Sequence, residues 1–256
     1  MAKPPPTKPP KNPVRDGRKS DQKQGKLSVR ELTTRVRTAK RRKGASTRWL
    51  QRQLNDPYVA EAKKQGYRSR AAFKLLEIDD QFKILKPGKK LVDLGAAPGG
   101  WSQIAVERLN TQGHKKGAIG KVVAIDIQPF DDIPGAICIE QDFLSASAAR
   151  ALKKASGGAV DLVISDMAAP STGHPGTDHL RIMGLLEEAY DFARNVLNPG
   201  GVFLGKVLQG GTEDTLLQSL KQDFKIVKHT KPPSSRADSR ESYVIALGFK
   251  GKSKDN

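Results

Sequence analysis

The stretch "VDLGAAPGGWSQ", residues 92–103, is where the sequence first combines residue types suited to ligand binding. An apolar run ends in Asp93, and a turn containing Gly95, Gly99 and Gly100 leads into a predicted helix. Glycines between a strand and a helix let a ligand approach the backbone closely. The turn lacks the Gly-Lys-Ser/Thr of a phosphate-binding loop and the middle glycine of G-x-G-x-x-G. It therefore favours a nucleoside-like ligand without a phosphate, S-adenosylmethionine.

Acidic residues close or follow several of the predicted strands. Asp126 closes "VVAID", where a carboxylate can accept hydrogen bonds from ribose hydroxyls, and Asp142 follows "ICIEQ", where it can accept from an adenine amino group. Asp93 and Asp166 close the first and fourth predicted strands, near the expected sulfonium and ammonium groups. Each aspartate alone is as typical of a turn or a helix cap as of a ligand site. Four of them at strand ends of one sheet favour a cofactor site.

Three further charged residues could take part in chemistry. Lys206 ends the strand "GGVFLGKV", which carries no other charge, so it is equally typical of a side chain reaching solvent at the sheet rim and of a placed ammonium. Lys74 lies on a predicted helix, where a lysine is more typically a solvated charge. Glu241 lies among basic residues, where a glutamate is more typically part of a surface ion pair.

Apolar runs that alternate with helical patterns must position these residues. We predict helical segments over 46–82, broken near Asp56-Pro57 and Gly66, with Ser69 as an N-cap. Further helices are predicted at 101–109, 146–154, 179–196 and 213–222, and strands at 90–94, 121–126, 136–140, 160–165, 201–206, 224–229 and 243–249. The alternation predicts an α/β protein with a Rossmann-like, doubly wound, mostly parallel seven-stranded sheet. No helix separates the last two strands, which therefore pair antiparallel.

Composition divides the chain into three parts. Residues 1–48 hold 16 Lys and Arg against 3 Asp and Glu, and so carry +13 of the net charge of +18. We expect residues 1–45 to form a disordered basic arm, 46–250 a folded domain and 251–256 a disordered tail. The arm could serve solubility, bind nucleic acid or, less in keeping with its Pro- and Lys-rich composition, act as a transit peptide.

The remaining composition suggests a setting for the domain. No apolar stretch is long enough to span a bilayer, and no signal peptide is visible, so we expect no membrane partner. The single cysteine, Cys138, excludes an internal disulfide and fits a reducing, cytoplasmic location. An aromatic content of 5% argues against a broad base-stacking surface. We expect a monomer.

At this point the sequence resembles the FtsJ/RrmJ family of ribosomal RNA 2′-O-methyltransferases. The motifs "SRAAFKL", "DLGAAPGGWSQ", "AIDIQP", "ISDMA", "GKVLQG" and "SSRADSRESY" occur in the order and spacing of that family, from about residue 46 to 249. The resemblance implies a catalytic tetrad of Lys74, Asp166, Lys206 and Glu241. With the argument from the turn and the strand ends, it indicates a site for S-adenosylmethionine that includes Asp93, Gly95, Gly99, Trp101, Asp126, Asp142 and Asp166.

The resemblance also implies a reaction and a substrate. A ribose 2′-hydroxyl would attack the methyl group of the sulfonium, on a uridine of 23S ribosomal RNA within the assembled 50S subunit. A neutral Lys206 at pH 7 would cost about 4–5 kcal/mol at an ordinary lysine pKa, and the sequence leaves the direction of its pKa shift open. We therefore expect Lys206 to position the hydroxyl and stabilise negative charge. Another RNA such as transfer RNA, or a non-catalytic role in ribosome assembly, are the alternatives.

One segment departs from the family pattern. After "SDMA" the family usually has Pro-Asn, whereas this chain has "APSTGHPGTDH", in a loop expected to border the substrate pocket. His174, Asp178 and His179 in this run could suggest a metal site, but a turn followed by a helix cap is the favoured interpretation. We expect no metal requirement.

Overall fold

The computed structural model describes residues 44–208 and 214–251, together with Thr38. All of these residues belong to one unit, Thr34–Asn256. The expected basic arm, residues 1–45, lies outside the described residues except for Thr38, Gly44 and Ala45, and so does the expected tail, except for Gly251. No helix in the described part is long and apolar enough to cross a membrane.

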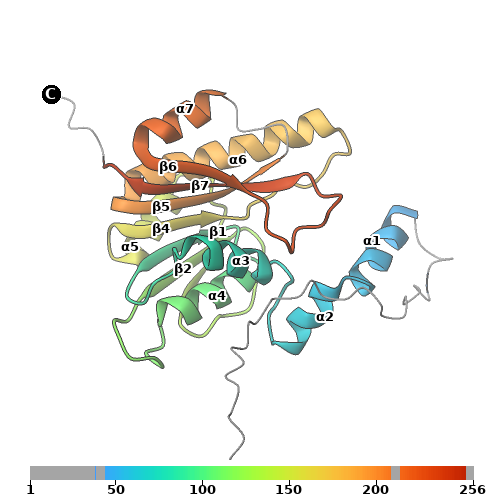
Figure 1. Ribbon diagram of the computed structural model, residues 1–256, viewed down its shortest axis with the longest axis horizontal. Helices are drawn as coiled ribbons and strands as arrows, with labels where there is room; N and C mark the ends of the chain where they lie inside the picture. The colour runs from blue at the N-terminus through green and yellow to red at the C-terminus, as the bar shows by residue number, and fades with distance from the viewer. Residues whose placement is uncertain (1–37, 39–43, 209–213, 252–256) are drawn as a thin grey trace, which may run out of the picture. The chain divides into compact units, whose positions relative to one another are not determined.

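A seven-stranded sheet forms the centre of the described unit, in the order β3-β2-β1-β4-β5-β7-β6 (Figure 1). Its first five strands are parallel, and β7 runs antiparallel to both β5 and β6. The α/β fold with a terminal antiparallel strand is thus confirmed. The strands are β1 (Lys90–Leu94), β2 (Lys121–Asp126), β3 (Ala136–Glu140), β4 (Val160–Ser165), β5 (Leu197–Leu208), β6 (Phe224–Thr230) and β7 (Glu241–Phe249).

Helices cover both faces of the sheet because buried strand residues alternate between two apolar cores (Figure 1). In β1, Val92 and Leu94 join the core that includes α5 and α6, whereas Leu91 joins the core that includes α3 and α4. The helices are α1 (Gly44–Leu54), α2 (Pro57–Lys64), α3 (Ala72–Phe82), α4 (Gly100–Leu109), α5 (Ala148–Ser156), α6 (Pro175–Val196) and α7 (Asp214–Asp223).

Most predicted elements are present, and their ends differ by a few residues. The break at Asp56-Pro57 is confirmed, since Asp56 caps α2 by accepting a hydrogen bond from the backbone N–H of Tyr58. The expected cap at Ser69 is wrong, because α3 has Ala71 at its N-cap without a side-chain hydrogen bond. Ser69 instead lies against the start of α4, where its Oγ occupies the space that a Cβ on Gly100 would need. Close packing between the two helix starts explains the difference.

Strand pairing brings distant residues to one edge of the sheet. Asp166 follows the carboxyl end of β4, and Lys206 lies near the carboxyl end of β5. Because β7 is antiparallel to β5, its first residues lie at the same edge, with Tyr243 opposite Lys206 and Glu241 opposite Leu208. β7 begins two residues earlier than predicted, so Glu241 is held on a strand.

Candidate active site

A buried ion pair between Lys206 and Asp166 forms the centre of the candidate site. The Nζ of Lys206 lies 2.8 Å from Oδ1 of Asp166 and donates a 2.8 Å hydrogen bond to the backbone oxygen of the same residue. The Lys206 side chain is only 6% exposed. The structure therefore favours the placed ammonium over a lysine that reaches solvent.

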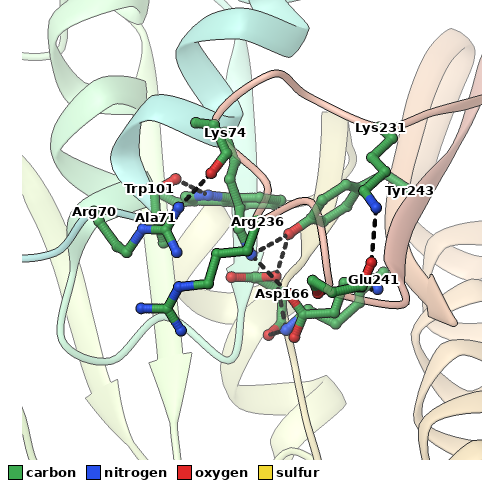
Figure 2. A network of polar contacts seen from close by, with 12 residues as sticks. Arg70, Ala71, Lys74, Trp101, Asp166, Lys231, Arg236, Glu241 and Tyr243 are labelled. Carbon is green, nitrogen blue, oxygen red and sulfur yellow. Dashed lines mark hydrogen bonds and ion pairs between the residues drawn. The ribbon is translucent and has the colours of Figure 1, made fainter. Parts of the chain in front are cut away.

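Tyr243 connects this pair to the other two predicted residues. Its hydroxyl donates to Oδ1 of Asp166 at 2.7 Å and accepts from Nζ of Lys74 at 3.1 Å. Lys74 also donates to Oε2 of Glu241 at 3.0 Å, as Figure 2 shows. All four residues of the predicted tetrad thus belong to one network with Tyr243.

Tyr243 was missed by the sequence reasoning, although its spacing carried a signal. Residues two apart in a strand point to the same face, so Tyr243 must face the same way as Glu241 if both lie in one strand. The predicted strand began at residue 243, so it excluded Glu241. It therefore did not show that the two side chains lie on the same face. The Tyr243 side chain is fully buried, and its ring lies 5.5 Å from that of Trp101.

The network favours the ionised forms of Lys206, Asp166 and Glu241. Burial acts to lower the pKa of Lys206, but the carboxylates of Asp166 and Glu241 outweigh it, so the pKa lies above its ordinary value. Burial acts to raise the pKa of Asp166, and Lys206 and Lys74 outweigh it, so this pKa is lowered. The pKa of Glu241 is lowered for the same reasons. The sequence alone left the direction of the Lys206 pKa shift open, and in the structure this shift is upward.

A cavity of about 700 Å³ lies beside the network at the carboxyl ends of the strands. Four of the predicted cofactor residues line it, Gly95, Asp126, Asp142 and Asp166. Gly95 has φ +76, and a Cβ there would approach Cγ of Met167 to 2.6 Å and its Cα to 2.9 Å. The turn consequently needs glycine at this position both for its backbone conformation and for space.

Two of the lining aspartates also stabilise their own loops. Asp126 accepts hydrogen bonds from the backbone N–H of Ala97 at 2.9 Å and of Gln128 at 2.8 Å. Asp142 accepts from the N–H of Leu144 at 2.9 Å. The loop-forming and ligand-facing interpretations of these residues are therefore compatible, because each carboxylate stabilises a loop and still borders the cavity.

Three other predicted cofactor residues do not line this cavity. Asp93 is fully buried, and its Oδ2 accepts a 2.6 Å hydrogen bond from Ser102. Gly99 has φ +110 at the N-cap of α4. The indole N–H of Trp101 donates to the backbone oxygen of Ala71 at 2.8 Å. The hydrogen bonds of Asp93 and Trp101 therefore hold the start of α4 in place, and Gly99 lets the turn lead into this helix.

The loop after Asp166 borders this cavity, which the predicted cofactor residues line, and its expected place beside the substrate pocket stays a prediction. Ala169 and Pro170, the first two residues of the segment that departs from the family pattern, line it together with Ala168. Farther along, Asp178 accepts hydrogen bonds from the hydroxyl of Ser171 at 2.6 Å and from the N–H and hydroxyl of Thr172, each at 2.7 Å. The favoured turn is present, but the expected helix cap is not, because His174 at the N-cap of α6 makes no side-chain cap hydrogen bond. Within residues 44–208 and 214–251, no group of three His, Cys, Asp or Glu side chains could hold a metal ion.

Comparisons with known proteins identify relatives of this chain. Residues 67–249 match the family model described as FtsJ-like methyltransferase. The chain is 61% identical over 224 residues to ribosomal RNA large subunit methyltransferase E of Paramagnetospirillum magneticum, covering 88% of this chain and 91% of that protein. It is also 61% identical over 222 residues to the protein of the same name from Rhodospirillum rubrum, covering 87% of this chain and 83% of that protein.

A solved structure shows the same relationship in three dimensions. A Plasmodium falciparum protein described as a ribosomal RNA methyltransferase matches with a TM-score of 0.63 and 33% identity, covering 73% of this chain and 100% of that one. The family match includes the glycine turn, the four charged residues of the network and Tyr243. This chain belongs to the FtsJ-like methyltransferase family.

Proposed function

We propose that this protein transfers a methyl group from S-adenosylmethionine to the ribose 2′-oxygen of a uridine in 23S ribosomal RNA, presented by the assembled 50S subunit. The observation that carries the proposal is the single buried network of Lys74, Asp166, Lys206 and Glu241 beside a cavity at the strand ends. A connected arrangement of two ammonium groups and two carboxylates can hold a hydroxyl in one orientation, which is a large part of catalysis.

The cavity fits the proposed cofactor. Its acidic residues, Asp126, Asp142 and Asp166, suit ribose hydroxyls, an amino group and a cation, whereas a nucleotide phosphate would be repelled. Apolar side chains for an adenine ring come from Ile127, Phe143, Leu144 and Met167. S-adenosylmethionine would supply an electrophilic methyl group with a neutral thioether as the leaving group.

Lys206 is the residue to which we assign the central role. Its raised pKa keeps the ammonium protonated in the free protein, so it can donate a hydrogen bond to the 2′-oxygen and stabilise the negative charge that develops there. Asp166 holds this ammonium, and Tyr243 and Lys74 hold Asp166 and Glu241 in turn. As the oxygen bonds to the methyl carbon, its hydroxyl proton passes to a solvent water, and the carbon–sulfur bond breaks so that the neutral thioether leaves with the bonding electrons.

The substrate is assigned from charge and from the relatives. The net charge of +18 favours a polyanionic partner. The low aromatic content favours recognition of backbone and folded shape, which suits RNA inside a ribosomal subunit. The curated relatives that cover most of this chain are named as methyltransferases of large-subunit ribosomal RNA.

A turnover assay tests the proposal. The purified protein is incubated with labelled S-adenosylmethionine and, in separate reactions, with undermethylated 50S subunits, free 23S ribosomal RNA and transfer RNA, and ribose methylation is mapped in the product. We expect label at a uridine 2′-oxygen with 50S subunits as the preferred substrate. Preferred labelling of transfer RNA would move the assignment to another RNA. Binding to 50S subunits without turnover would favour an assembly factor.

A further inference from the structure

Two arginines converge on one carboxylate oxygen beside the network. Oδ2 of Asp56 lies 3.1 Å from Nη1 of Arg70, and 3.1 and 3.0 Å from Nε and Nη2 of Arg236. Arg70 immediately precedes the first turn of α3, and Arg236 lies in the loop between β6 and β7. We call Asp56, Arg70 and Arg236 the arginine junction.

The arginine junction carries an excess positive charge in a largely buried place. The side chains of Asp56, Arg70 and Arg236 are 7%, 15% and 30% exposed. One carboxylate faces two guanidinium groups, which leaves one positive charge without a counterion inside the junction. Burial, the largest effect, and the repulsion from Arg236 together outweigh the attraction of Asp56 and Glu241 and lower the pKa of Arg70. Uncompensated charge at low exposure is costly, and an incoming anion would relieve the cost.

A small polar pocket of about 200 Å³ opens between the junction and the network. It is lined by Arg52, Arg70, Lys74, Arg236, Asp238, Ser239 and Glu241. Figure 2 shows Arg70 and Arg236 beside Lys74 and Glu241. Arg52 and Asp238 form a 3.6 Å ion pair with exposed side chains and so add no net charge. The Nε of Arg70 is buried and has no partner within the described residues.

The loop between β6 and β7 has several contacts besides those of Arg236. The backbone N–H of Ser234 donates to Oε2 of Glu77 at 2.7 Å, and a guanidinium N–H of Arg70 donates to the backbone oxygen of Ser234. Lys231 adds a 2.7 Å hydrogen bond to the backbone oxygen of Ser239. Arg236 adds its bonds to Asp56 and a 3.1 Å hydrogen bond from Nη2 to Oε1 of Gln53 in α1, so it also joins this loop to the preceding helices.

We propose that this pocket binds a phosphodiester group of the acceptor RNA next to the target ribose. Arg236 and Arg70 donate hydrogen bonds to the phosphate oxygens, and Asp56 is a positioning residue that aims both guanidinium groups. A guanidinium fork matches phosphate geometry, and the pocket shares Lys74 and Glu241 with the network, so a phosphate held here lies beside the reacting sugar. This inference rests on the proposed function.

Arg236→Gln tests the site with undermethylated 50S subunits as the probe. We expect the KM for 50S subunits to rise about tenfold, because a charge-assisted phosphate contact is lost. The slope of log affinity against log salt should become shallower by about one. The saturated rate and the affinity for S-adenosylmethionine should stay unchanged. Arg150→Gln, an equal charge change on exposed α5, is the matched control and should retain the wild-type KM.

Two further measurements keep the test decisive. Arg236→Lys keeps the charge without the fork, and should raise the KM less than Arg236→Gln while leaving the salt slope unchanged. Asp56→Asn should raise the KM with the saturated rate unchanged, because the guanidinium groups lose their alignment. Should Arg236→Gln fail to fold, as judged by its melting curve, Arg236→Lys decides alone: a wild-type KM overturns the site.

The outcomes separate this site from the proposed function. A wild-type KM and salt slope in Arg236→Gln, with the wild-type protein active, would overturn the phosphate site and leave the methyltransferase assignment standing. A wild-type protein that transfers no methyl group to any RNA would overturn the proposed function, and this inference with it.

Discussion

Lys206 is subject to two opposing electrostatic effects. Burial favours the neutral amine, and the carboxylates of Asp166 and Glu241 favour the ammonium. The second effect is larger, because the 2.8 Å contact with Asp166 replaces much of the lost hydration. The resulting ammonium is a pre-positioned donor rather than a proton acceptor in the free protein.

Replacement of Lys206 gives the most direct test of this role. Lys206→Ala should lower the methyl transfer rate by at least about 10³-fold, because a stabilising donor is removed from the transition state. Its affinity for S-adenosylmethionine should stay close to the wild-type value, measured by calorimetry, since Lys206 does not line the larger cavity. Lys221→Ala on exposed α7 is the control. An active Lys206→Ala enzyme would contradict the assignment.

Tyr243 should contribute to both stability and activity. In Tyr243→Phe, Asp166 and Lys74 lose a buried hydrogen-bond partner, so the free energy of unfolding should fall by about 1–3 kcal/mol. The rate of methyl transfer should fall as well, because the hydroxyl that connects the Asp166 carboxylate to the Lys74 ammonium is removed.

A second tyrosine serves as the control for that measurement. The hydroxyl of Tyr190 donates to Asp223 at 2.7 Å, away from the network. Tyr190→Phe should therefore lower the stability in denaturant titrations and leave the saturated transfer rate unchanged. Equal kinetic losses in the two variants would show that Tyr243 acts only through stability.

The unit formed by β1, the glycine turn and α4 depends on a buried acid. Asp93 ends the apolar part of β1, and its carboxylate accepts a hydrogen bond from Ser102 in α4. Burial raises its pKa from 3.8 to about 7, although the hydrogen bond from Ser102 opposes the shift. This helix start is therefore stabilised by a group that titrates near neutral pH.

The sign of this shift predicts a pH dependence of stability. A raised pKa means that the fold favours protonated Asp93, so its contribution is fully present below pH 3.8 and is lost as the pH rises through about 7. Over this range, the free energy of unfolding of the wild type should fall relative to that of Asp93→Asn. Denaturant titrations across the range measure it. Parallel curves for the wild type and Asp93→Asn would contradict the assignment.

For the whole molecule, charge is concentrated outside the catalytic unit. Residues 1–48 carry +13 of the net +18, and α1 begins within this segment at Gly44. Electrostatic attraction to RNA depends on the number of phosphates that a protein neutralises, so most of this long-range attraction should come from the basic arm.

Deletion of residues 1–43 tests the contribution of the arm. The affinity for 50S subunits should fall and its salt dependence should become flatter, whereas the saturated transfer rate should change much less. Affinity is measured at several salt concentrations, with the full chain as reference. An unchanged salt slope after deletion would mean that the arm serves only solubility.

Local sequence patterns determined the elements and the chemistry of the turn. Apolar runs of strand length identified all seven strands, because burial on both faces of a parallel sheet requires them. The glycine turn and the aspartates at strand ends indicated a cofactor edge, and Gly95, Asp126, Asp142 and Asp166 do line one cavity. These features depend on residues that are close together in the chain, and so they can be predicted from the sequence alone.

Tertiary structure alone decided how the distant residues act together. Lys74 and Glu241 are 167 residues apart, and their contact depends on packing α3 beside a strand inserted antiparallel between β5 and β6. Burial and partners from other segments also determine three further features. These are the link through Tyr243, the upward pKa shift of Lys206 and the buried position of Asp93. Such effects fall off steeply with distance in space, and separation along the chain does not reveal that distance.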